Sequence, residues 1–232
     1  MLQMVIDKAT DDHPEFEART AIEVSHLYGL LASLFRAEPS IETLRALRSP
    51  ELSELLGEAG IGVDQAPADE ADDAELLEEM AVEYTALFIG PGGHISPHES
   101  VHMPRGSGTL WGNETVAVKR FIEGLGLEYT EDYKGLPDHI SVELDLMATL
   151  AGHEGRAWEK GDLAGAANAL DYQAEFLDQH LLKWVPLFCQ KVIDTAGMEF
   201  YRGLARLTRD FLASEVEDVA RRKNLARPDD AD

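Results

Sequence analysis

Three histidines lie four residues apart between Gly92 and Pro104, with a glutamate among them. On a helix, His94, His98 and His102 would share one face, and Glu99 would add a carboxylate nearby. Imidazole and carboxylate groups gathered on one face are typical ligands of zinc and related metals. One hypothesis is therefore a histidine-dependent metal-binding protein that uses the loop of His94, His98 and His102.

The residues around these histidines argue against a helix. Gly92 and Gly93 precede them, Pro97 lies between the first two, and Pro104 follows. Proline removes a helical hydrogen bond and clashes with the preceding turn, and glycine is a poor helix former. Without a helix, the four-residue spacing imposes no common face. We therefore expect no metal site here.

Other residues with catalytic potential also lack a supporting pattern. Asp138 and His139 could form an acid/base pair, but at a helix start we expect Asp138 to cap the helix or complement its dipole, with His139 packed beside it. No serine of the loop has a Gly-x-Ser-x-Gly context, and Cys189 lies in an apolar helical pattern. No glycine-rich phosphate motif is present. We predict no catalytic residue, no cofactor and a protein that is not an enzyme.

The charge balance limits the kinds of partner. The 232 residues include 44 acidic and 20 basic side chains, for a net charge of −24. Such a chain repels nucleic acid and attracts basic partners, although the acidity also suits solubility in a salty cytoplasm, and both interpretations stay open. The N-terminus lacks the pattern of a secretory signal, and no apolar run reaches about 18 residues, the length that would span a membrane. We expect a cytoplasmic protein without membrane insertion.

The elements that position these residues are predicted to be helical almost throughout. Apolar residues recur at helical spacing in the ranges 15–35, 74–88, 113–125, 140–160, 163–184 and 200–211, with short helices after Ser40 and at Pro50. No segment shows sustained strand alternation. The predicted fold class is all-α, with a single bundle-like domain over residues 1–232.

Glycine, proline and polar residues mark the connections within this domain. Glycines and prolines crowd residues 89–112, so we predict a long loop there, and loops of that length are often functional. We further expect a looser N-terminal part at 1–60, an acidic connection at 62–73 and a frayed tail at 221–232. Asn113 and Asp162 are expected helix N-caps, and Pro186 is expected to kink or split its helix.

Four ordered blocks carry a resemblance to a known family. They are residues 84–91 (YTALFIGP), 96–102 (SPHESVH), 137–144 (PDHISVEL) and 180–188 (HLLKWVPLF). In order and spread they resemble the TorD/DmsD/NarJ family of redox-enzyme maturation chaperones. The resemblance extends from about residue 21 to residue 211, so it covers most of the chain.

The resemblance implies an all-helical, non-catalytic, cytoplasmic chaperone of anaerobic respiration. Members of the family bind the twin-arginine signal peptide, and often the immature body, of a molybdopterin-containing oxidoreductase subunit. They assist cofactor insertion and prevent premature export. Both a monomer and a domain-swapped dimer remain open, since the connection at 127–136 has the length of a swapping hinge.

The resemblance also implies which residues bind the client. Carboxylates of Glu99, Asp138 and Glu143 would suit bidentate pairing with arginine, and Leu87 and Phe88 would supply an apolar pocket. His98 and His102 stand where relatives commonly place tryptophan or tyrosine, which indicates a differently composed client peptide. The full predicted set comprises Tyr84, Leu87, Phe88, Pro97, His98, Glu99, Ser100, His102, Pro137, Asp138, His139 and Glu143.

Overall fold

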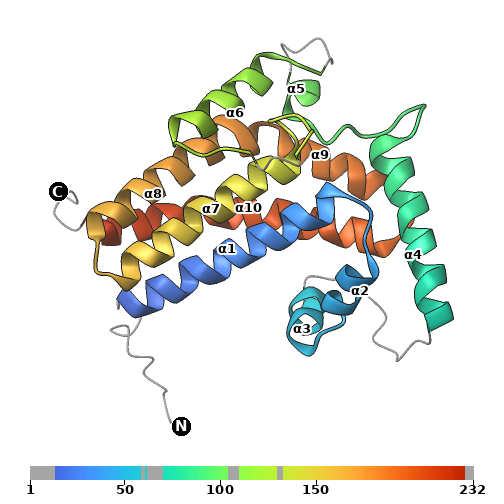
Figure 1. The fold of residues 1–232 in the computed structure, drawn as a ribbon, viewed down its shortest axis with the longest axis horizontal. Helices are drawn as coiled ribbons and strands as arrows, with labels where there is room; N and C mark the ends of the chain where they lie inside the picture. The colour runs from blue at the N-terminus through green and yellow to red at the C-terminus, as the bar shows by residue number, and fades with distance from the viewer. Residues whose placement is uncertain (1–13, 59–60, 62–69, 104–109, 130–132, 228–232) are drawn as a thin grey trace, which may run out of the picture.

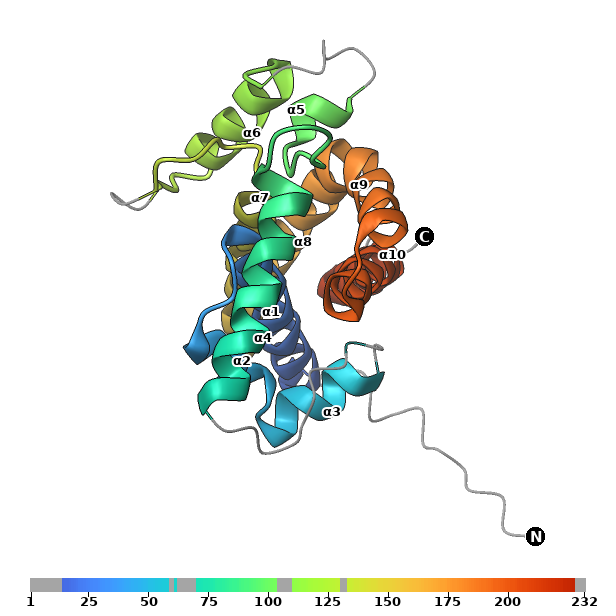
Figure 2. The ribbon, with the colours of Figure 1, turned by 90° about the vertical axis from the view of Figure 1, so that its right-hand side faces the viewer.

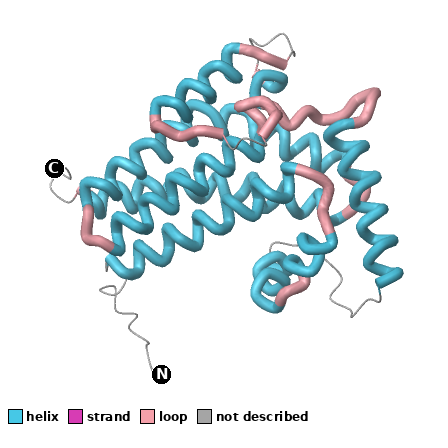
Figure 3. Tube along the Cα trace, viewed as in Figure 1, coloured by secondary structure: helices cyan, strands magenta, loops and turns pink. Residues whose placement is uncertain are grey.

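Helices make up the architecture of the computed structural model, which describes residues 14–58, 61, 70–103, 110–129 and 133–227 (Figure 1). The elements in chain order are α1 (Pro14–Arg36), α2 (Ile41–Leu47), α3 (Pro50–Glu58), α4 (Glu70–Tyr84), the π-helix η1 (Thr85–Ile89), α5 (Glu99–His102), α6 (Asn113–Gly124), α7 (Ile140–Glu159), α8 (Leu163–Phe176), the π-helix η2 (Leu177–Leu181), α9 (Leu182–Thr195) and α10 (Glu199–Ala226). The described residues form no strand, as Figure 3 shows, so the predicted all-α class is confirmed.

The core lies where α1, α7, α8 and α10 run side by side (Figure 1). Helices α1 and α7 approach closely because Gly155 has no side chain: a Cβ atom there would stand 2.8 Å from Ile22. Tyr28 and Leu31 of α1 are fully buried against this core. The N-terminal part is therefore tighter at α1 than the looser 1–60 that we predicted. Residues 1–13 lie outside the described residues.

A buried ion-pair network closes the bundle at its C-terminal end. Arg222 of α10 donates from Nε to Glu154 of α7 over 3.0 Å and from Nη2 to Glu215 over 3.3 Å. Trp158 and Gln173 also donate to the Glu154 carboxylate. The prediction of a frayed tail over 221–232 is wrong up to Ala226, because this network holds the last turns of α10 in the core. Residues 228–232 are not described.

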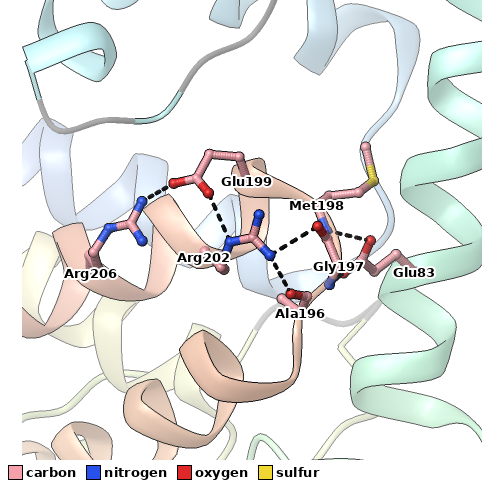
Figure 4. A network of polar contacts seen from close by, with 7 residues as sticks. All are labelled: Glu83, Ala196, Gly197, Met198, Glu199, Arg202 and Arg206. Carbon is pink, nitrogen blue, oxygen red and sulfur yellow. Dashed lines mark hydrogen bonds and ion pairs between the residues drawn. The ribbon is translucent and has the colours of Figure 1, made fainter.

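Helix α4 crosses the end of the bundle (Figures 1 and 2). It is joined to α10 by the Tyr201 hydroxyl, which donates to the Met80 carbonyl over 2.8 Å, and by the Glu83 carboxylate (Figure 4). Glu83 accepts hydrogen bonds from the backbone amides of Gly197 and Met198, immediately before α10 begins. Arg202 closes the same turn through the Ala196 and Gly197 carbonyls. Helix α4 begins at Glu70, so the last part of the acidic connection predicted at 62–73 is helical; residues 62–69 lie outside the described residues.

Local signals for helix ends were only partly correct. Asp162 caps α8 as predicted, accepting from the Gly165 amide over 2.9 Å. Gly112, and not Asn113, is the N-cap of α6. Pro186 was expected to kink or split its helix, but it lies inside α9, which runs without interruption from Leu182 to Thr195; the irregular segment is the π-helical turn η2 that precedes α9. None of the described helices has the length and apolarity needed to cross a membrane.

Candidate functional site

The loop that carries the histidines is pinned at three points. Gly92 and Gly93 turn the chain with φ angles of 96° and 111°, a left-handed conformation that favours glycine. The Ile95 amide then donates to the Leu87 carbonyl over 2.6 Å. Further along, the Ile140 amide donates to the Pro97 carbonyl and the Glu99 amide to the Asp138 carbonyl. The loop is thus fixed between the end of η1 and the start of α7.

The predicted loop at 89–112 contains more regular structure than its glycines and prolines suggested. The π-helix η1 continues to Ile89, and α5 forms one turn at Glu99–His102 with His98 as its N-cap. The short helix forms because it starts after Pro97, so no proline lies inside it. Residues 104–109 of the loop are not described.

The three histidines point to different partners. The His98 ring meets the His139 ring edge-on at a centroid distance of 4.9 Å, while His102 stacks on Trp184 at 5.4 Å. The His94 side chain is exposed. No group of three or more His, Cys, Asp or Glu side chains able to hold a metal ion occurs among the described residues. Since all three histidines are described, this geometry argues against the metal-binding hypothesis.

Burial favours the neutral form of His98, His102 and His139. It lowers the pKa of His98 and of His102, and it lowers that of His139 to about 3, with a further contribution from His98. The His139 Nδ1 atom accepts from the Ser141 amide and caps α7, the role that we had assigned to Asp138. Neutral rings offer flat faces on which an aromatic or guanidinium group can stack.

Three carboxylates lie behind the loop and not on its surface. Glu99, Asp138 and Glu143 are each no more than 1% exposed. Asp138 accepts from the Ser100 amide at 3.0 Å, Glu99 lies 2.9 Å from His180 Nδ1, and Glu143 accepts from Trp184 Nε1 at 3.0 Å. Burial first, and then the neighbouring Glu99, raise the pKa of Glu143 well above its ordinary value. These carboxylates hold α5, α7 and α9 together, and in this structure they do not reach solvent.

The aromatic block is also internal. Tyr84, Leu87 and Phe88 are 3–5% exposed, and the Phe88 ring packs against Phe35 and Phe188. Exposing each such side chain would cost about 1.5–3 kcal/mol. Their visible role is therefore to position the loop, since the Leu87 carbonyl receives the Ile95 amide.

The predicted residues thus separate into two sets. The partly buried set consists of His98, His102 and His139, while Pro97, Ser100 and Pro137 join the carboxylates and the aromatic block inside the protein. The structure brings the loop and the start of α7 together, as the four blocks implied. Whether any of the twelve residues contacts a client stays a prediction.

Sequence reasoning missed a cavity beneath the loop. It has a volume of about 740 Å³ and is lined in part by His94, His102, Leu110 and, on α9, Lys191 and Thr195. The α9 residues were detectable, because Leu187, Lys191 and Thr195 recur every four residues and so share the face of α9 one turn apart.

Large apolar side chains are exposed around this region. Ile89 is 61% exposed, Leu187 51% and Trp111 74%. Phe88 and Phe188 pack 6.0 Å apart, which brings their neighbours Ile89 and Leu187 to the same part of the molecule. Trp111 also has a φ of 70°, a strained conformation for a bulky residue, and such strain occurs most often at functional sites.

The described residues thus form an all-helical domain with a pinned loop, partly buried histidine rings and a partly apolar rim. Comparisons with known proteins define the class further. The chain matches the family described as nitrate reductase delta subunit over residues 41–190, and it belongs to that family. This confirms the predicted TorD/DmsD/NarJ relationship.

Named relatives agree with this assignment. The chain is 26% identical to the chaperone protein TorD of Vibrio cholerae serotype O1 (El Tor Inaba N16961) over 203 residues, covering 82% of this chain and 89% of the relative. It is 27% identical to the TorD of Shewanella piezotolerans, covering 83% and 90%. The crystal structure of a proposed redox enzyme maturation protein from Archaeoglobus fulgidus shares the fold, with a TM-score of 0.54, 24% identity and coverage of 82% and 93%. The chain is thus a maturation chaperone and not an enzyme.

Proposed function

We propose that this chaperone binds the twin-arginine signal peptide and the immature body of a molybdopterin-containing oxidoreductase subunit. It acts in the cytoplasm, assists cofactor insertion and delays export of the client. Family membership carries the chaperone part of this proposal. The observation that carries the peptide-binding part is the pinned loop, which presents neutral histidine rings beside a cavity of about 740 Å³.

The chemistry of a twin-arginine leader suits this surface. Guanidinium groups stack on flat rings, and His98 and His102 carry such rings at partly buried positions. The apolar residues that follow the arginines would meet Ile89 and Leu187. The net charge of −24 attracts a basic leader over a longer range. In this arrangement Glu99, Asp138 and Glu143 act indirectly, by holding the loop in place.

A direct test measures binding of a fluorescent leader peptide to single-site variants. We expect His98→Ala and Leu187→Ser each to weaken binding about ten-fold, since each removes about 1.4 kcal/mol of stacking or apolar contact. A leader with two lysines should bind less tightly than one with two arginines, because lysine lacks the planar fork.

Matched controls separate this effect from a general one. His153→Ala and Val82→Ser change an exposed histidine on α7 and an exposed apolar residue on α4, away from the loop, and should leave the affinity unchanged. The proposal fails if the unaltered protein does not bind the leader, or if the loop variants bind it as tightly as the controls do.

A further inference from the structure

A second groove runs along α7, on a different part of the surface from the histidine loop. It has a volume of about 710 Å³ and lies between α1 and the segment that follows α6. Ser25 and Arg36 line it from α1, while Leu127 and Tyr129 line it from the other side. Of the residues that line the groove, only Val142 falls within the four sequence blocks, and none belongs to the proposed leader site.

The groove follows α7 over several turns. Its α7 residues extend from Val142 to Arg156, which at 1.5 Å per residue corresponds to about 21 Å. Ala148, Thr149 and Gly152 line its middle, where α1 approaches closely: the Ser25 hydroxyl donates to the Ala148 carbonyl over 2.7 Å, and a Cβ atom at Gly152 would stand 3.2 Å from the Ser25 oxygen. An extended peptide rises about 3.3 Å per residue, so the groove would hold about six residues.

Two exposed side chains of opposite charge line the groove. Arg156 lies towards the end of α7, with its guanidinium folded back over Gly152, and Glu128 lies beside Tyr129 in the segment after α6; neither forms a hydrogen bond or ion pair with another residue in the described part of the chain. Arg36 of the wall is already paired with Asp145. The groove therefore has a fixed polarity, positive at Arg156 and negative at Glu128.

Aromatic groups reinforce the negative end. Tyr129 and Tyr133 stack with a centroid distance of 5.8 Å, and the Tyr133 hydroxyl donates to the Leu136 carbonyl near the start of α7. The Tyr129 hydroxyl is buried without a hydrogen-bond partner among the described residues. Ring faces beside Glu128 favour a cation, and an unpartnered hydroxyl favours a peptide group that can bond to it.

We infer that this groove binds an extended segment of a partner protein, apolar in its middle, basic at the Glu128 end and acidic at the Arg156 end. The partner is the body of the client, and that part of the inference rests on the proposed function. Charge complementarity at both ends and the apolar floor at Leu146 and Val142 select this occupant.

The test uses the full-length protein and a capped synthetic peptide of about seven residues, with lysine at one end, glutamate at the other and apolar residues between. Binding is measured by calorimetry. We expect Arg156→Gln to weaken binding about five-fold, and to have no effect on a peptide whose glutamate is replaced by glutamine. Glu128→Gln should behave in the same way towards the lysine. Thr149→Trp, which fills the groove, should abolish binding of every peptide.

Arg120→Gln is the matched control, because Arg120 is an exposed cation of α6 that does not line the groove. Circular dichroism checks that each variant is folded. The inference is overturned if the peptide shows no saturable binding, if Arg120→Gln weakens it as much as Arg156→Gln, or if Thr149→Trp instead dissociates an oligomer, which would make a second copy of the chain the occupant. Thr149→Trp should leave leader binding unchanged, so failure of the leader site and failure of the groove remain distinguishable.

Discussion

At the scale of single residues, burial changes what the polar side chains of the loop region do. From the sequence, Asp138 and Glu99 were expected to bind the arginines of a client peptide. In the fold, Asp138 accepts a hydrogen bond from the Ser100 backbone amide and Glu99 contacts the His180 imidazole. His139 takes the capping role expected of Asp138. Burying a polar group costs free energy unless it is hydrogen-bonded, and here the hydrogen bonds of each group also fix the loop against a helix.

The effect of burial on Glu143 can be tested by measuring stability as a function of pH. Its folded pKa is raised by burial, then by Glu99, so its protonated form stabilises the fold below the unfolded pKa, and that stability is lost as pH rises towards the folded pKa. Glu143→Gln mimics the protonated form and keeps an acceptor for Trp184. We expect the melting temperature of this variant, relative to the unaltered protein, to rise between about pH 5 and pH 8. A difference that does not vary with pH would contradict a neutral Glu143.

At the scale of elements, one carboxylate connects α4 to a helix more than a hundred residues away in the chain. Glu83 accepts the amides of Gly197 and Met198, which the helix α10 cannot satisfy itself (Figure 4). A negative charge there also complements the helix dipole. This contact places α4, and with it η1 and the start of the loop.

Glu83→Ala should therefore destabilise the protein by about 1–2 kcal/mol, the usual effect of losing a helix cap. Hydrogen exchange should increase at the start of α10 and in α4 before it increases in α7. Glu79→Ala is the control, because Glu79 is exposed one turn earlier on α4 and has no hydrogen bond or ion pair with other described residues. Equal effects of the two variants on exchange would show that Glu83 is not the connection.

At the scale of the whole molecule, the charged side chains are unevenly distributed between the surface and the core. The net charge of −24 lies mostly on exposed helix faces, whereas Arg222 is fully buried between Glu154 and Glu215. Removing one partner of a buried ion network leaves an uncompensated charge, which is more costly than replacing the whole network by apolar groups. Helices α7, α8 and α10 therefore depend on one guanidinium.

Arg222→Ala should lower the free energy of unfolding by about 3–5 kcal/mol, as measured by urea denaturation. Arg209→Ala, in the same helix but at an ion pair with Asp210 near the surface, should lower it by less than about 1 kcal/mol. A similar small effect at Arg222 would mean that the end of α10 contributes little to the core, in agreement with the frayed tail that we first predicted.

Most of the fold that could be predicted from the sequence followed from helical periodicity. The α1, α7 and α10 patterns have one apolar face each, and such a face must pack against another element, so the all-α class and the main helices followed from local spacing. The four blocks identified the family through their order and separation along this chain, although the overall identity to the TorD of Vibrio cholerae is only 26%. The helix ends at Gly112 and His139 did not follow, since several residues near each end could serve as the cap.

Only the tertiary structure decided which polar residues are accessible. Periodicity reports the face of a helix but not what lies against it, so the burial of Glu143 and Phe88, the uncommitted charges of Arg156 and Glu128, and the close approach of α1 to Gly155 could not be read from spacing. The sequence by itself determined that this chain is a helical chaperone of its family. The packing of distant segments decided which of its surfaces are open to a partner, because accessibility is a property of neighbours that are far apart in the chain.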